Sequence, residues 1–197
     1  MIGDIFQVII DDHLTPYIRV KTQDNGTDSV ITFGSISQLN DTDSDSLKNN
    51  IIMGLVNIEE DRISRKPDNY VRTPDLTYKK PPVYLNLYVL FVANFDPLAY
   101  QASLNFITLI IKFFQAQNIF THANSPNLPT AVDELIFDMK TLSFQDLNNL
   151  WGILGSKYMP SVLYKVRLLS VSDDFTQGPA QIVQQITITE QTIEETA

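Results

Sequence analysis

The sequence predicts an α/β domain of the α+β kind: a mixed, mainly antiparallel sheet with two helices packed on it and an N-terminal helix at an edge or interface. Three observations support this fold class. Residues 83–93 are an apolar run rich in β-branched and aromatic side chains, which suits a strand buried on both faces. Residues 98–117 follow helical spacing. Further strand patterns flank both segments.

The strand at 83–93 leads into the most apolar helix of the chain. Asp96 is suited to cap this helix, and Pro97 suits its first position, where the missing N–H costs nothing. Over 98–117 the polar side chains form one narrow stripe, and we estimate an apolar arc of about 240° from 3.6 residues per turn. One sheet cannot cover so wide an arc. We therefore expect a second packing surface, either another helix of this chain or another subunit. The stripe consists of Gln101, Asn105, Thr108, Lys112 and Gln115.

The N-terminal part predicts one helix, two strands and a long polar connection. Apolar residues follow helical spacing over 2–14, and Pro16 predicts the end of that helix, because the residue before proline disfavours helical geometry. A turn at 23–29 and a short strand at 30–33 follow. After a polar loop at 36–50, a strand is expected at 51–60, with Gly54 as a possible bulge.

The C-terminal part predicts three more strands and one helix. A strand at 135–142 precedes Ser143 and Asp146, which have the spacing of a capping box. The helix that follows, 144–155, places Trp151 on its apolar face, so we expect Trp151 in the core. A strong strand at 161–171 and a weaker edge strand at 182–190 complete a single domain over residues 1–190. Residues 191–197 are expected to be a frayed acidic tail.

A basic arm separates the strands at 51–60 and 83–93. Four prolines in residues 61–82 argue against a central strand or helix there. The arm suggests contact with an acidic neighbour, possibly another copy of the chain; a mobile, solvated loop is equally compatible with it. No Lys or Arg follows Arg167, so basic arm and acidic C-terminal end could meet head to tail in a ring. The candidate contact residues are Arg62, Arg65, Lys66, Arg72, Lys79 and Lys80.

Composition narrows the classes of partner and compartment. The net charge of −9 argues against nucleic acid and anionic membrane as partners. The chain has no cysteine, which excludes disulfides and thiol catalysis and fits assembly in a reducing cytoplasm. The segment 98–117 has the length of a membrane span, but its polar stripe speaks against one. No secretory signal is expected at the N-terminus, and we expect a soluble protein.

The residues that usually carry catalysis or bind cofactors form no recognisable pattern. His13 and His122 lie in no metal-ligand spacing; His13 is expected to be a core or interface imidazole and His122 a loop residue. Phosphate-binding glycine motifs and a nucleophile elbow are absent from the sequence. The acidic loop at 41–45 alternates like a calcium loop but lacks its glycine and closing glutamate. We therefore predict no enzyme, no catalytic residue, no metal and no cofactor.

An ordered set of segments resembles a known family. The segment 150–154 with its Leu-Trp pair and the segment 157–167, Lys-Tyr-Met-Pro-Ser-Val-Leu-Tyr-Lys-Val-Arg, are its most recognisable part. The N-terminal helix, the strand at 55–60 with its Arg-bearing loop, and the segment 82–90 agree in order. Over roughly residues 2–172 the chain resembles the cap, or tail-terminator, family of extracellular contractile injection systems. These are phage-tail-like particles of the antifeeding-prophage and Photorhabdus virulence cassette type.

The resemblance implies a tail-terminator-like fold and a structural function. It implies a ring, expected to be a hexamer, that sits on the distal end of the inner tube, stops its growth and joins tube to sheath. Partners would be further copies of the chain, the tube and sheath proteins, and possibly a paralogous cap adaptor. Assembly in the bacterial cytoplasm and release with the particle are implied. A baseplate or sheath-associated role is the nearest alternative, and a small-ligand-binding domain using the loop at 36–48 and His122 is a distant one.

Overall fold

We describe the protein from a computed structural model. Contacts divide the chain into two compact units: residues 1–65 with 82–171, and residues 66–81 with 172–197. The single domain expected over residues 1–190 stays a prediction, which limited proteolysis would test. The structure describes residues 2–23, 30–37, 47–61, 71–72, 77–79, 83–130, 132–171 and 176–179, with the backbone alone at 71–72, 77–79, 168–171 and 176–179.

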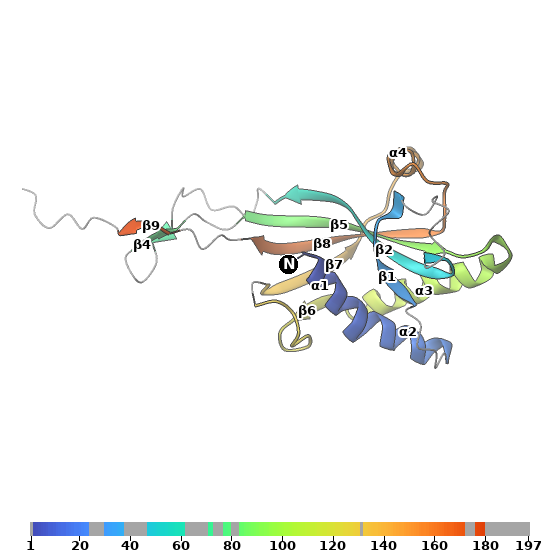
Figure 1. Ribbon diagram of the computed structural model, residues 1–197, viewed down its shortest axis with the longest axis horizontal. Coiled ribbons are helices and arrows are strands. Elements are labelled where there is room, and N and C mark those ends of the chain that lie inside the picture. Colours follow the sequence, from blue (N-terminus) through green and yellow to red (C-terminus); the bar gives the residue numbers. More distant parts are fainter. Residues whose placement is uncertain are drawn as a thin grey trace, which may run out of the picture. The chain divides into compact units, whose positions relative to one another are not determined.

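The first unit is built on a six-stranded sheet in the order β1-β2-β5-β8-β7-β6 (Figure 1). Only β1 and β2 pair in parallel; the other neighbours are antiparallel, which confirms the predicted mixed, mainly antiparallel sheet. The edge strand β6 was not predicted, because three residues directly after a helix give too short a pattern. The strands are β1 (Ile31–Phe33), β2 (Asn50–Glu60), β5 (Val83–Asn94), β6 (Ile119–Thr121), β7 (Glu134–Met139) and β8 (Ser161–Val171).

The central strands β5 and β8 bury side chains on both faces of the sheet. Phe91 pairs with Val162, and Leu90 with Leu163. Since successive side chains of a strand alternate between faces, Phe91 points into the larger hydrophobic cluster and Leu90 into a smaller one on the opposite face. The apolar run at 83–93 is continuous because a hydrophobic cluster covers each face of the sheet at this strand. β7 ends at Met139 rather than at 142 as expected, although Lys140 still donates its N–H to the Leu163 carbonyl.

The larger cluster lies under helix α3 (Tyr100–Ala116), which a short 3₁₀ turn, η4 (Pro97–Ala99), introduces. Asp96 caps this turn as predicted: its carboxylate accepts the Leu98 N–H at 2.9 Å. The polar stripe of α3 is exposed, while Ile110, Phe113 and Phe114 are buried. By length and composition alone, Pro97–Ala116 is the one helical stretch of the described residues that could cross a membrane.

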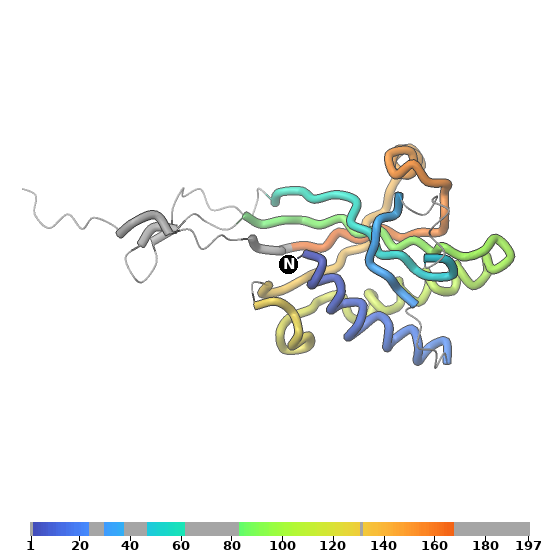
Figure 2. Tube along the Cα trace, in the orientation of Figure 1, coloured from blue at the N-terminus to red at the C-terminus, as the bar shows by residue number. Residues whose placement is uncertain are grey.

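The N-terminal helical segment supplies the second packing surface that α3 requires. Its trace runs alongside α3 in Figure 2, and the rings of Tyr17 and Phe113 lie 5.3 Å apart. Of the two surfaces considered from the sequence, another helix of the same chain is thus confirmed. The segment comprises α1 (Ile2–Val8), the π-helical η1 (Ile9–Leu14) and α2 (Thr15–Thr22).

The predicted helix end at Pro16 is wrong, because the helix continues to Thr22. The physical reason is the π-helical turn that precedes the proline. Thr15 donates its N–H to the Ile10 carbonyl, five residues back, instead of four. This wider turn places Pro16 in the first turn of α2, where its missing donor is not needed.

Helix α4 (Phe144–Leu154) packs over the opposite face of the sheet and is separated from α3 by it (Figure 1). Ser143 caps α4 by accepting the Asp146 N–H at 3.1 Å, and its hydroxyl donates to the Asp146 carboxylate at 2.7 Å. Gly155 ends the helix with φ of 66°, which glycine adopts without strain. Trp151 is only 5% exposed, so its predicted core position is confirmed.

Gly54 has a different role from the predicted bulge. The register shift between β2 and β5 falls between Leu55 and Asn57, so the bulge lies one residue or more beyond Gly54. A Cβ built on Gly54 would lie 2.6 Å from Cδ1 of Ile36, closer than any real contact. Glycine is therefore needed because the Ile36 side chain packs directly against β2 at this position and leaves no room for a Cβ.

The second unit contains a small sheet in the order β3-β4-β9. Its strands β3 and β4 lie in the proline-rich segment 61–82, where the sequence analysis expected no central strand. They are two and three residues long, which the flanking prolines permit. The strand predicted at 182–190 and the tail at 191–197 lie outside the described residues. The strands are β3 (Val71–Arg72), β4 (Thr77–Lys79) and β9 (Thr176–Pro179).

Candidate assembly interface

The predicted contact residues of the basic arm fall almost entirely outside the described part of the chain. Arg62, Arg65, Lys66 and Lys80 are outside it. Arg72 lies on β3 and Lys79 on β4, whose backbones alone are described. Their role in contacts between subunits therefore stays a prediction. The surface features that the structure does describe are apolar, and they lie elsewhere.

The first such feature is the α3 corner, which we define as Leu98, Tyr100 and Leu104. Leu98 is 98% exposed, and the other two side chains are also exposed. The corner rests on a rigid base, because the Phe95 and Phe106 rings stack at 5.1 Å. A fully exposed leucine on an ordered turn gains nothing from folding, so this geometry favours contact with another surface.

Hydrogen bonds hold the chain immediately before the α3 corner. Asn94 donates its side-chain amide to the Leu47 carbonyl at 2.8 Å, and the Asp96 N–H donates to the Asn49 side chain at 3.3 Å. The Ala99 N–H reaches the Asp96 carbonyl at 2.8 Å. The corner therefore needs little ordering on contact, which lowers the entropic cost of association.

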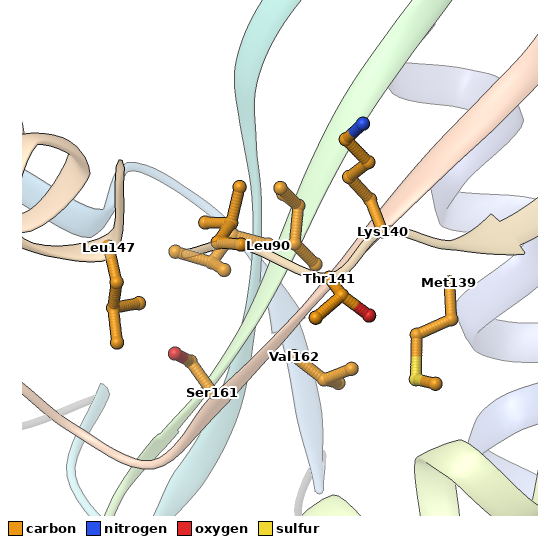
Figure 3. Close-up of a pocket in the computed structure, with 9 residues that line it drawn as sticks. Leu90, Met139, Lys140, Thr141, Leu147, Ser161 and Val162 are labelled. Atoms are coloured by element: carbon orange, nitrogen blue, oxygen red, sulfur yellow. The ribbon is translucent and has the colours of Figure 1, made fainter. Parts of the chain in front are cut away.

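The second feature lies on and beside α4. Phe144 is 93% exposed and Ile153 84% exposed, at opposite ends of the helix. Beneath the first half of α4 lies an open pocket of about 220 Å³ between the helix and strands β5 and β8 (Figure 3). Leu90, Leu147 and Val162 line it, and its polar groups are the hydroxyls of Thr141 and Ser161 and the amine of Lys140. It holds no carboxylate or imidazole and suits an apolar side chain rather than a reacting substrate.

Cross-strand polar groups cover part of the α4 face of the sheet. The Tyr88 hydroxyl donates to the Glu59 carboxylate at 2.6 Å, and this bond raises the pKa of Tyr88 to about 12. The Lys165 ammonium lies 6.0 Å from the centre of the Tyr88 ring. Arg167 and Asp138 form an ion pair at 2.6 Å between β8 and β7. These interactions connect β2 with β5, β5 with β8, and β8 with β7, and each joins groups of complementary charge or polarity.

His13 forms a contact that the sequence analysis missed. Its Nε2 lies 2.5 Å from Oγ of Ser125, and its ring packs edge-on against Phe120. Next to it, Asn127 donates to the Asp12 carboxylate at 2.9 Å. The loop after β6 is thus fastened to the N-terminal helical segment. Ser125 is fully buried, so this serine–histidine pair presents no nucleophile to a substrate. The sequence predicted a core or interface imidazole; His13 is half-buried and contacts the core at Phe120, whereas its partner Ser125 could not be inferred.

We expect the stability of the protein to fall as the pH drops through the titration of His13. Burial lowers the pKa of His13 from its ordinary value of 6.5, against the opposing effect of Asp12. The unfolded chain thus binds the proton more readily, so the stabilisation is present above about pH 6.5 and is lost below it. Urea unfolding between pH 5 and 8 should show a smaller dependence on pH for His13→Gln than for the wild type. Equal slopes would contradict this role of His13.

Metal ligands do not gather anywhere in the described ranges: no group of three His, Asp or Glu side chains could hold an ion there. The acidic loop at 41–45 lies outside those ranges, and His122 is exposed in the loop after β6. The described surface thus defines a class of protein, an α+β module that exposes several large apolar side chains on ordered elements. Such a module fits assembly with other proteins better than conversion of a small molecule.

Comparison with known proteins identifies the family. A sequence model of the Pvc16 N-terminal domain matches residues 5–185, so the chain belongs to that family. Among curated proteins, none matches the sequence significantly.

Two solved structures share the fold. One is the sheath/tube terminator of PVC, an extracellular contractile injection system, in the extended state. It has a TM-score of 0.63 and 18% identity, over 100% of this chain and 65% of that one. The other is the tube-terminating cap of the anti-feeding prophage, with a TM-score of 0.55 and 16% identity, over 92% of this chain and 60% of that one. The chain thus spans less than two thirds of either protein.

Proposed function

We propose that this chain is a structural cap that terminates the inner tube of a contractile injection system. Copies of it form a ring, six in number, on the distal tube end, where the ring stops tube growth and joins tube to sheath. The observation that carries the proposal is the likeness of the whole chain to a protein described as a sheath/tube terminator. Membership in the Pvc16 N-terminal domain family and the likeness to a tube-terminating cap support it.

The partners in this proposal are further copies of the chain, the inner tube protein, the sheath protein and a paralogous cap adaptor. No catalytic step is needed, because blocking a tube end requires only a rigid surface of matching shape. The apolar pocket beneath α4 is a surface of that kind. Assembly takes place in the bacterial cytoplasm, and the cap leaves the cell with the particle.

Electron microscopy of particles made without this protein tests the proposal. Loss of a terminator is expected to give tubes of widely scattered length, because nothing stops the addition of tube subunits. Loss of a baseplate or sheath-associated component, the nearest alternative, would instead lower the number of particles, and those that form would have the normal length. A normal yield of particles with the normal length would exclude both roles.

The basic arm is expected to contribute charged contacts to this assembly. Reversing Arg62, Arg65, Arg72 and Lys80 to glutamate together should weaken ring formation or docking roughly tenfold, on the order of 1.4 kcal/mol. Light scattering coupled to size exclusion measures the change, and the wild-type ring should loosen with added salt. Lys157→Glu, an exposed charge after α4, serves as the control. Unchanged assembly of the quadruple variant would remove the arm from the interface.

A further inference from the structure

A third apolar feature of the first unit lies at the far end of α3 from the α3 corner. We call it the aromatic groove: an open groove of about 380 Å³ between the end of α3 and the end of β7. The buried rings of Phe114, Phe137 and Tyr164 form its floor. Its border consists of the apolar Ile111 and Met139 and the polar Gln115, Asn118 and Asp138. The ring of Phe114 lies 4.5 Å from that of Phe137 and 4.7 Å from that of Tyr164. The floor is therefore rigid and apolar.

The groove is large enough to take an aliphatic side chain, and an apolar residue at its border is exposed. Met139 is 57% exposed at its side although it lies next to three aromatic rings. Burial raises the pKa of the Tyr164 hydroxyl, at the floor of the groove, to about 12. Filling such a groove with an apolar side chain releases its water and gains contact with the rings.

The α3 corner and the aromatic groove lie at opposite ends of one helix. α3 has 17 residues and is therefore roughly 25 Å long. Leu98 precedes its first turn, whereas the groove begins at Ile111. A protrusion and a hollow at two ends of one molecule cannot meet within that molecule. They can meet between copies in a head-to-tail contact, which closes into a ring when the rotation permits.

The charges near the two features are of opposite sign. Asp96 lies beside Leu98 at the corner. The basic residue next to the groove is Lys112, which is exposed on α3 one turn before the groove-lining Gln115. The one carboxylate that lines the groove, Asp138, is neutralised by its ion pair with Arg167. A corner approaching the groove of another copy is therefore steered toward it rather than repelled.

We propose that Leu98 of one copy inserts into the aromatic groove of the next copy, and that this contact repeats around the ring. The occupant of the groove is thus a second copy of this chain. The inference rests on the proposed ring, and it names the two surfaces that form each contact within it.

Cross-linking of paired cysteines tests the contact directly, because the chain has no cysteine of its own. Leu98→Cys is combined with Gln115→Cys, at the exposed rim of the groove. A short bis-maleimide should link the full-length double variant into a ladder that ends at the ring. Each single variant should give no product beyond a trace of dimer. The matched control, Leu98→Cys with Ile153→Cys, should give no ladder, because Ile153 lies on α4 away from the groove.

Two results would overturn the proposal. One is the absence of a ladder from the double variant at protein concentrations where the wild type forms rings. The other is strong dimer formation by Leu98→Cys alone, which would mean that two corners face each other. In both cases the proposed terminator function stands, because the wild-type ring is still observed. Absence of any wild-type ring, in solution or on tube ends, would contradict the proposed function itself.

A surface substitution provides a second measurement that does not depend on cross-linking. Leu98→Lys should weaken assembly of the full chain at least tenfold in light scattering, since it places a charge in a largely apolar groove beside Lys112. Val20→Lys is the control, because Val20 is an exposed apolar side chain on α2 that belongs to neither the α3 corner nor the aromatic groove, and it should assemble like the wild type. Equal assembly by both variants would overturn the proposal.

Discussion

Replacing Phe114 by alanine is expected to lower the free energy of unfolding by about 3–5 kcal/mol, the usual cost of removing a buried phenylalanine. Phe114 is the centre of the aromatic core: its ring lies within 6.3 Å of Phe91, Phe113, Phe120, Phe137 and Tyr164. These neighbours come from α3 and from the four strands β5, β6, β7 and β8. The cavity would open between elements that cannot collapse independently, so the loss should lie at the upper end of the range.

Urea unfolding measures this effect, and the residue after Phe114 supplies the control. Gln115 is exposed on the polar stripe, so Gln115→Ala should change the stability by less than about 0.5 kcal/mol. A loss below about 1 kcal/mol for Phe114→Ala would mean that the rings repack around the gap. The rigid floor of the aromatic groove would then lose its support as well.

Replacing Gly54 by alanine is expected to destabilise the protein by about 1–3 kcal/mol through overpacking. The new Cβ would lie 2.6 Å from Cδ1 and 2.7 Å from Cγ1 of Ile36, and 3.1 Å from the Gly34 carbonyl oxygen. Ile36 is itself buried in the cluster beneath α4. Any shift of Ile36 would disturb the packing of this cluster, which includes Trp151.

A double-mutant cycle isolates this clash. In an Ile36→Ala background, which removes both contacting carbons, Gly54→Ala should cost less than half of what it costs in the wild type. Equal costs in the two backgrounds would locate the strain at the Gly34 carbonyl instead. Urea unfolding of the four proteins, monitored by Trp151 fluorescence, provides the comparison.

Local signals in the sequence predicted most elements of the first unit. The start of the helical segment at α3 was predicted from Asp96 and Pro97, and the two ends of α4 were predicted from Ser143 and Gly155. These predictions succeeded because capping depends on residues within one turn of each other. Trp151 was placed in the core by helical spacing alone. The helix end predicted at Pro16 was wrong, because whether a proline ends a helix depends on the hydrogen-bond register around it. The spacing of apolar residues does not reveal a π-helical turn.

Contacts between distant segments could not be predicted. Ser125 lies 112 positions from His13, and nothing in either neighbourhood indicates the other. The aromatic groove likewise combines α3, β7 and β8, whose side-chain patterns separately predict only burial. The wide apolar arc of α3 did predict a second packing surface, and α2 provides it. It could not reveal that Leu98 would be left exposed on a rigid turn.

Addition of the purified chain to growing inner tubes tests the central claim most directly. Tubes polymerised from the tube protein are mixed with the chain and examined by negative-stain electron microscopy at successive times. We expect a ring at one end of each tube and an arrest of lengthening, with Leu98→Lys much less effective than the control Val20→Lys. Continued growth at the normal rate, with the chain absent from the ends or spread along the sides, would contradict it.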